Sequence, residues 1–219
     1  MRQNVSLAEI SDGHLYKAND MVKADCGGCE GCSQCCRGMG NSIILDPYDV
    51  YRLTTGIRKS MQELLATSVE LNVVDGVILP NLKMQGTGEA CAYLDAAGRC
   101  SIHPYRPGIC RLFPLGRHYE NGGLFYFLQT GECVKENRSK VKVSKWIDTP
   151  ELKRNEQFKL QWHDLLSAMT DRVAGEDEGK QREENLLLLR LFYLLPYEGT
   201  TDFYSQFTER MEHWNEQIG

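Results

Sequence analysis

The stretch DCGGCEGCSQCCRGMG, residues 25–40, places five cysteines within eleven positions. Four of them recur at every third residue and the fifth follows directly: Cys26, Cys29, Cys32, Cys35 and Cys36. A buried free cysteine acts as a small hydrophobic residue, which would explain one or two such positions. It does not explain five of them in one short, glycine-rich stretch. The stretch therefore indicates a site that binds metal or carries out redox chemistry.

The composition of the whole chain is that of a globular protein with a substantial core. The chain has 219 residues, of which 42% are hydrophobic and 25% are charged. Its net charge of −5 gives no reason to expect nucleic acid or an anionic membrane surface as a partner. We expect a protein or redox partner, whose identity the sequence does not indicate.

The pattern of the chain leads us to expect a cytoplasmic protein without a membrane span. Its first ten residues, MRQNVSLAEI, lack the basic segment and apolar run of a secretory signal. The most apolar stretch, Leu186–Leu195, is far shorter than the roughly 20 residues that span a bilayer. Because reducing cytosol disfavours structural disulfides, clustered thiols there more often bind metal or act in redox chemistry.

The sequence predicts an α+β fold that is mostly helical, in three parts. Residues 1–24 are polar and form a lead-in. Residues 25–145 form an irregular, cysteine-rich metal-binding domain with short hairpins. Residues 146–219 contain no cysteine and form a helical C-terminal subdomain, because their apolar residues recur at helical spacing.

Two helices are predicted shortly after the cysteine stretch. Asp46 and Pro47 are typical of an N-cap and a first helical turn, and Gly56 is expected to end this helix. The residues SMQE at 60–63 form a capping box for the second helix, whose apolar stripe runs as far as Val69.

Three further helices are predicted in the C-terminal subdomain. The first starts at residues 149–151 and carries an apolar stripe to Val173. A break is expected at residues 175–180, after which a leucine-rich helix runs to Pro196. The last helix begins near Phe203.

Turn signals predict short hairpins in the middle of the chain. Residues 75–76 and 121–122 are the pairs Asp-Gly and Asn-Gly, which favour two-residue hairpin turns. A third turn, at residues 95–98, is flanked by Cys91 and Cys100.

The continuous C-x2-C-x2-C-x2-C spacing favours an iron–sulfur cluster. Zinc sites usually combine two separate C-x2-C pairs, whereas iron–sulfur proteins use a continuous run and one distant cysteine. We favour a loop that surrounds the cluster and enters a short helix near Ser33. The alternative is a helix through the whole stretch, with Cys29, Cys32 and Cys36 on one face.

Candidate metal ligands are found among all nine cysteines of the chain: Cys26, Cys29, Cys32, Cys35, Cys36, Cys91, Cys100, Cys110 and Cys133. Adjacent side chains point in different directions, so Cys35 and Cys36 can face different sites. Nine thiols allow one [4Fe–4S] cluster or two, and zinc is the alternative metal.

The segment CEGCSQCC at 29–36, followed by CAYLDAAGRCSIHPYRPGICRLFP at 91–114 and a late cysteine, resembles the CxxCxxCC family of zinc- or iron-chelating proteins. The resemblance covers about residues 24–135 and implies metal chelation. Cys26 is additional to the minimal motif. A related motif in the flagellin lysine methylases implies an iron–sulfur cluster and methyl transfer.

Arg106 and Arg111 flank Cys110. We expect them to stabilise a thiolate-ligated cluster through charge and hydrogen bonds, although they could instead pair with surface carboxylates. His103 follows Cys100 by three residues, so it could complete a Cys/His zinc site or fix the loop by a hydrogen bond.

Three functions are consistent with these observations. The favoured one is an iron–sulfur protein that acts in electron transfer or as a cluster-dependent enzyme. The second is a zinc-chelating scaffold or binding protein without redox chemistry. The third is a thiol redox protein with labile disulfides. No residue is marked as catalytic.

Overall fold

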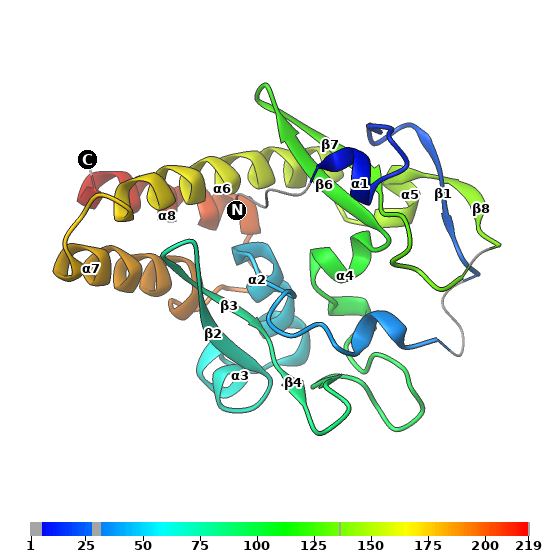
Figure 1. Cartoon of the computed structure of the whole chain (residues 1–219). Helices are drawn as coiled ribbons and strands as arrows, with labels where there is room; N and C mark the ends of the chain where they lie inside the picture. Colours follow the sequence, from blue (N-terminus) through cyan, green and yellow to red (C-terminus); the bar gives the residue numbers. More distant parts are fainter. Residues whose placement is uncertain (1–5, 28–31, 136, 219) are drawn as a thin grey trace.

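The computed structural model of the chain describes residues 6–27, 32–135 and 137–218. It combines short antiparallel hairpins with a helical C-terminal region (Figure 1). The predicted fold class, α+β and mostly α, is confirmed.

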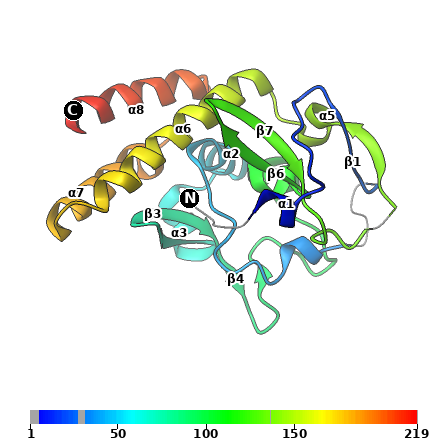
Figure 2. The ribbon, with the colours of Figure 1, turned by 45° about the horizontal axis from the view of Figure 1, so that its top comes forward.

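The C-terminal helices lie together on the side of the molecule away from β1 (Figure 2). They are α6 (Leu152–Val173), α7 (Glu178–Leu189), the π-helix η3 (Arg190–Leu194) and α8 (Phe203–Ile218). The predicted break is shorter than expected, because the Asp177 carboxylate accepts hydrogen bonds from the backbone N–H groups of Gly179 and Lys180 and starts α7 there.

Two capped helices, α2 (Pro47–Ile57) and α3 (Met61–Thr67), follow the cysteine stretch where they were predicted. Both begin with a capping box, formed by Asp46 with Asp49 and by Ser60 with Glu63. In each box, each side chain accepts a hydrogen bond from the backbone N–H of the other residue, so two N–H groups at the start of the helix are satisfied.

The prediction that Gly56 ends α2 is wrong. The helix continues to Ile57 and closes at Arg58, which has a left-handed backbone with φ of 55°. Gly56 instead allows a close approach: a Cβ at this position would lie 2.2 Å from the ring of Tyr105, in the short helix η2 (His103–Tyr105).

Val69 lies in a strand and not in the apolar stripe of α3. The α3 helix ends at Thr67, and Ser68 donates its backbone N–H to the carbonyl of Leu64. Val69 then begins β2, where it pairs with Leu82. Pairing with the neighbouring strand therefore takes precedence over the helical spacing.

The predicted hairpins at residues 75–76 and 121–122 are confirmed. The strands β2 (Val69–Val74) and β3 (Val77–Leu82) flank the first turn, and β6 (Leu115–Glu120) and β7 (Gly123–Leu128) flank the second. A further short pair joins β4 (Met84–Gln85) to β5 (Ala90–Cys91).

The lead-in contains α1 (Leu7–Ile10) and part of the strand β1 (Met21–Asp25), which pairs with β8 (Ser139–Lys142). Side chains from β1, β6 and β7 form a small core with α4 (Gly108–Leu112) and α5 (Val143–Ile147). This core holds the helix that carries Cys110.

The main core is shared between the cysteine-rich region and the C-terminal helices. Buried side chains of α2, α3, β2 and β3 pack there against those of α6, α7, η3 and α8. Half-buried Cys91, Cys100 and Cys110 pack against the same core. Among the described residues, no helix is long and apolar enough to cross a membrane.

Candidate metal centre

The short 3-10 helix η1 (Gln34–Cys36) carries Cys35 and Cys36. It begins after Ser33, and the backbone N–H of Arg37 closes it on the carbonyl of Gln34. The prediction of a short helix entered near Ser33 is confirmed.

A second segment, with Cys91 and Cys100, lies beside η1. Arg37 forms a β-bridge with Ala90, and the backbone N–H of Gly38 donates to the carbonyl of Glu89 at 3.0 Å. Leu94 forms a further bridge with Cys100, which closes the predicted turn between the two cysteines.

The helix α4 is the third cysteine-bearing segment of this region, and it carries Cys110. It lies between the two cores, because Leu112 is buried in the smaller core while Cys110 packs against the main core. In Figure 1, α4 lies between η1, in blue below it, and the strands β6 and β7 above it.

These three segments bring together a group of thiols that we call the five-thiol cluster: Cys35, Cys36, Cys91, Cys100 and Cys110. Charge on Cys91, Cys100 or Cys35 raises the pKa of Cys110, so these thiols are near enough to interact electrostatically. All of them are half-buried, and all are free thiols. Soft, neighbouring sulfur donors are the ligand type that zinc and iron–sulfur clusters require.

Cys35 and Cys36 form a hydrogen-bonded pair with opposite pKa shifts. This hydrogen bond and, as a smaller effect, the charge of Arg106 lower the pKa of Cys35 to about 7. The same bond raises the pKa of Cys36, and burial raises it further. Burial is the largest cause of the raised pKa values of Cys91 and Cys110. A bound metal cation would lower the pKa of each thiol that it coordinates, because coordination deprotonates thiols.

The five thiols are not arranged for one small ion. Within residues 6–27, 32–135 and 137–218, no three side chains of His, Cys, Asp or Glu are placed to ligate a single metal ion.

Arg106 supplies an unpaired donor next to these thiols. Its Nε atom is buried and has no hydrogen-bond partner, while Nη1 donates to Nε2 of His103 at 2.9 Å. Its charge also acts on Cys35 and Cys100. A buried N–H without a partner is costly, and a negatively charged metal–thiolate group beside it would offset that cost. The residues present thus fit a thiolate-ligated centre.

Residues 28–126 match the family model of CxxCxxCC, described as a "putative zinc- or iron-chelating domain". The match covers this segment of the chain and not the C-terminal helices α6, α7 and α8. The resemblance noted in the sequence is therefore confirmed, and it supports metal binding. A search of curated proteins and a search of solved structures each found no match.

The CxxCxxCC segment includes the five-thiol cluster, whereas Cys26 and Cys133 lie outside it. Cys26 directly follows β1, and Cys133 precedes the paired strand β8. Cys32 lies just before η1. Cys29 lies outside the described residues. These four remain predicted ligands.

Arg111 holds the backbone around α4. Its guanidinium donates to the carbonyl oxygens of Pro104 and Asp148. Arg52 donates to the same Pro104 oxygen. Arg111 thus joins α4 to η2 and to the C-terminal end of α5, and its predicted interaction with a cluster stays a prediction.

His103 is exposed and serves as a hydrogen-bond acceptor for Arg106. Because a guanidinium can only donate, Nε2 of His103 accepts and the ring is neutral with its proton on Nδ1. Burial and the charges of Arg106, Arg111 and Arg99 lower the pKa of His103. The geometry corresponds to the loop-fixing interpretation of this residue.

Asp49 is a residue at this site that the sequence reasoning did not assign. Its side chain is buried at 3% exposure, and Oδ1 accepts a hydrogen bond of 2.7 Å from the backbone N–H of Gly108. The D-x-x-D pattern that starts α2 was the available signal for its capping role. Its contact with α4, 59 positions away in sequence, has no local signal.

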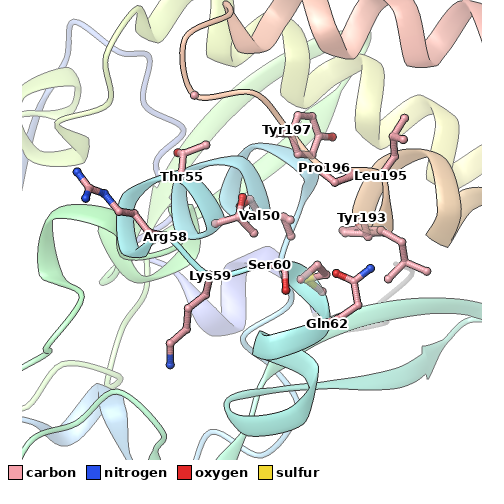
Figure 3. Close-up of a pocket in the computed structure, with 14 residues that line it drawn as sticks. Val50, Thr55, Arg58, Lys59, Ser60, Gln62, Tyr193, Leu195, Pro196 and Tyr197 are labelled. Atoms are coloured by element: carbon pink, nitrogen blue, oxygen red, sulfur yellow. The ribbon is translucent and has the colours of Figure 1, made fainter.

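A separate pocket of about 360 Å³ lies between α2, α3 and η3. It is lined by side chains such as Val50, Tyr193 and Pro196, and by no cysteine. The side chains of Arg58 and Lys59 point away from Tyr193 and Pro196 (Figure 3). No group of polar side chains converges in it, so we do not assign it as the site.

Proposed function

We propose that the five-thiol cluster holds an iron–sulfur cluster and that the protein acts in electron transfer or in cluster-dependent catalysis. The observation that carries this proposal is the convergence of thiols from η1, from the segment between Cys91 and Cys100, and from α4. Four of the five thiols would ligate the cluster. When bound, an iron–sulfur cluster supplies one-electron redox chemistry.

The sequence spacing of the cysteines supports an iron–sulfur cluster. Iron–sulfur proteins use a continuous C-x2-C run with one distant cysteine, whereas zinc sites usually combine two separate pairs. Residues 26–36 provide such a run, and Cys91, Cys100 and Cys110 provide distant thiols.

Arg106 and the partly covered site support the same proposal. The unpaired Nε–H of Arg106 is suited to donate to a cluster or ligand sulfur. Such hydrogen bonds stabilise the reduced, more negative state of an iron–sulfur centre and raise its potential. The packing of Cys91, Cys100 and Cys110 against the main core limits solvent access on that side.

Zinc is the second candidate, because the family description includes zinc as well as iron. In a Cys₄ zinc site, four of the five thiols would bind one ion. The protein would then be a scaffold or binding protein without redox chemistry.

The test is metal and acid-labile sulfide analysis of the full chain purified without oxygen. Iron and sulfide in comparable amounts, with a brown colour, are the expected result. Stoichiometric zinc without sulfide would replace the iron–sulfur proposal by the zinc alternative. Metal-free protein that forms a reversible disulfide would favour the thiol redox function, for which the lowered pKa of Cys35 would be suited.

A further inference from the structure

A network of charged side chains lies next to Gly108, the first residue of α4. It consists of Asp46, Asp49, Arg117 and Lys159. Lys159 is 4% exposed and forms an ion pair with Asp46, at the start of α2. Asp49, one helical turn further, accepts the backbone N–H of Asp46 on Oδ2. The network thus joins α6, which carries Lys159, to the first turn of α2.

Gly108 lies against this network. A Cβ at this position would be 3.2 Å from Nη2 of Arg117, 3.4 Å from Nζ of Lys159 and 3.5 Å from Oδ1 of Asp49. The backbone of the turn therefore lies in close contact with these charged side chains. Of the three, Asp49 accepts a hydrogen bond from the backbone N–H of Gly108, at 2.7 Å.

This hydrogen bond fixes the position of the Cys110 turn. Gly108 is the first residue of α4, and Cys110 follows it by two residues within the same five-residue helix. A helix of this length has little stability of its own, so its place depends on contacts such as this one. Asp49 also lies close enough to Cys110 for its charge to act on the thiol.

Opposing effects act on the charge of Asp49. Burial raises the pKa of its carboxyl to about 6, while the N–H of Gly108 and the cations of Arg117, Arg111 and Arg52 favour the charged form. At pH 8 the carboxylate is therefore a negative charge near one ligand of the candidate centre.

We propose that Asp49 is a positioning residue for the metal centre: it places Cys110 through the Gly108 N–H and contributes a negative charge that lowers the reduction potential. This inference rests on the proposed binding of metal at Cys110. A nearby negative charge disfavours the addition of an electron, so its removal raises the potential.

The test compares anaerobically purified full-length wild type with Asp49→Asn, Asp49→Glu and Asp148→Asn at pH 8. Asp148→Asn is the matched control, because it also removes a carboxylate near Arg111 but one that is 86% exposed. The measurements are iron and sulfide per chain, the midpoint potential and the visible spectrum.

Asp49→Asn is expected to raise the midpoint potential and to lower cluster content, because the amide is neutral and its N–H₂ group would face the N–H of Asp46. Asp49→Glu keeps the charge but displaces the carboxylate by one methylene group. We expect it to lower cluster content with a smaller change in potential. If Asp49→Asn does not fold, Asp49→Glu provides the test, and wild-type cluster content in that variant contradicts the positioning role.

Equal potential and cluster content in Asp49→Asn, Asp148→Asn and wild type would overturn the inference while leaving the proposed function intact. If the wild type holds zinc, the same variants are compared after exchange to Co²⁺. The thiolate-to-cobalt absorption bands should then shift in Asp49→Asn and not in Asp148→Asn, and unchanged bands overturn the inference. A wild type that binds no metal removes the proposed function and this inference with it.

Discussion

At Gly56, the absence of a side chain decides how closely two segments approach. The ring of Tyr105 occupies the place of a Cβ, so η2 packs directly on α2. At Gly108 the approach is less close, since a Cβ there would lie 3.2 Å from Nη2 of Arg117 and 3.5 Å from Oδ1 of Asp49. Both glycines lie in segments that connect α2 with the region of His103–Leu112, where two arginines and Cys110 are located.

Gly56→Ala is predicted to destabilise the protein by about 1–3 kcal/mol. Alanine in a helix interior would ordinarily add about 0.5–1 kcal/mol of stability, but a methyl group 2.2 Å from the Tyr105 ring must displace that ring and overpack the site. Urea unfolding measures the difference. Gly88→Ala is the control, because its nearest atom lies 3.6 Å away. Equal stability of Gly56→Ala and wild type would contradict the close packing.

His103 is predicted to stay neutral at pH values where an ordinary histidine begins to protonate. Burial and three neighbouring arginines lower its pKa, so the folded state binds fewer protons than the unfolded state. Its contribution to stability is therefore present above the ordinary pKa and is lost as the pH falls. Arg106→Gln should raise the pKa of His103 in an NMR titration, and Arg99→Gln should raise it less. No change in Arg106→Gln would contradict the described pair.

At the scale of helices and strands, local sequence patterns predicted the helix starts and hairpin turns that contacts between nearby residues determine. Capping boxes and Asp-Gly or Asn-Gly turns marked α2, α3 and two hairpins correctly. The error at Val69 arose because pairing with Leu82 took precedence over the local pattern. At Gly56 the helix extends by one more residue before the left-handed backbone of Arg58 closes it.

The candidate site was predictable in its donors and less so in its arrangement. The cysteine spacing indicated metal binding, and the flanking cysteines were recognised as the other donors. The sequence did not show that Cys91, Cys100 and Cys110 lie with η1. That arrangement depends on β-bridges and on the contact between Asp49 and Gly108, which join residues far apart in the chain.

The packing of α6 against α2 depends on a buried ion pair, so Lys159→Met is predicted to cost about 3–5 kcal/mol of unfolding free energy. The substitution leaves Asp46, whose side chain is 14% exposed, without its partner. The double variant Asp46→Asn, Lys159→Met should recover part of the loss, because no unpaired charge remains. Denaturant unfolding tests this. If the unfolding free energy of Lys159→Met lies within about 1 kcal/mol of the wild-type value, the ion pair has no large stabilising role.

At the scale of the whole molecule, metal removal is predicted to loosen the cysteine-bearing segments more than the C-terminal helices. The described part of residues 25–40 contributes no side chain to the fully buried cores, whereas α6 and α8 bury several aromatic side chains. Hydrogen exchange with and without metal should therefore differ most at η1 and α4 and least in α6 and α8. Equal protection of η1 in both states would contradict this dependence.

The central claim is that the five-thiol cluster ligates an iron–sulfur centre, and iron per chain in matched variants tests it most directly. Cys100→Ser and Cys110→Ser are compared with Ser101→Ala, a neighbouring substitution at an exposed hydroxyl that donates to the Tyr93 carbonyl. All proteins are prepared without oxygen and reduced for electron paramagnetic resonance. Loss or strong alteration of iron content and signal in at least one cysteine variant, with wild-type values in Ser101→Ala, is the predicted result. Wild-type iron, sulfide and signal in both cysteine variants, or zinc without sulfide in the wild type, would contradict the claim.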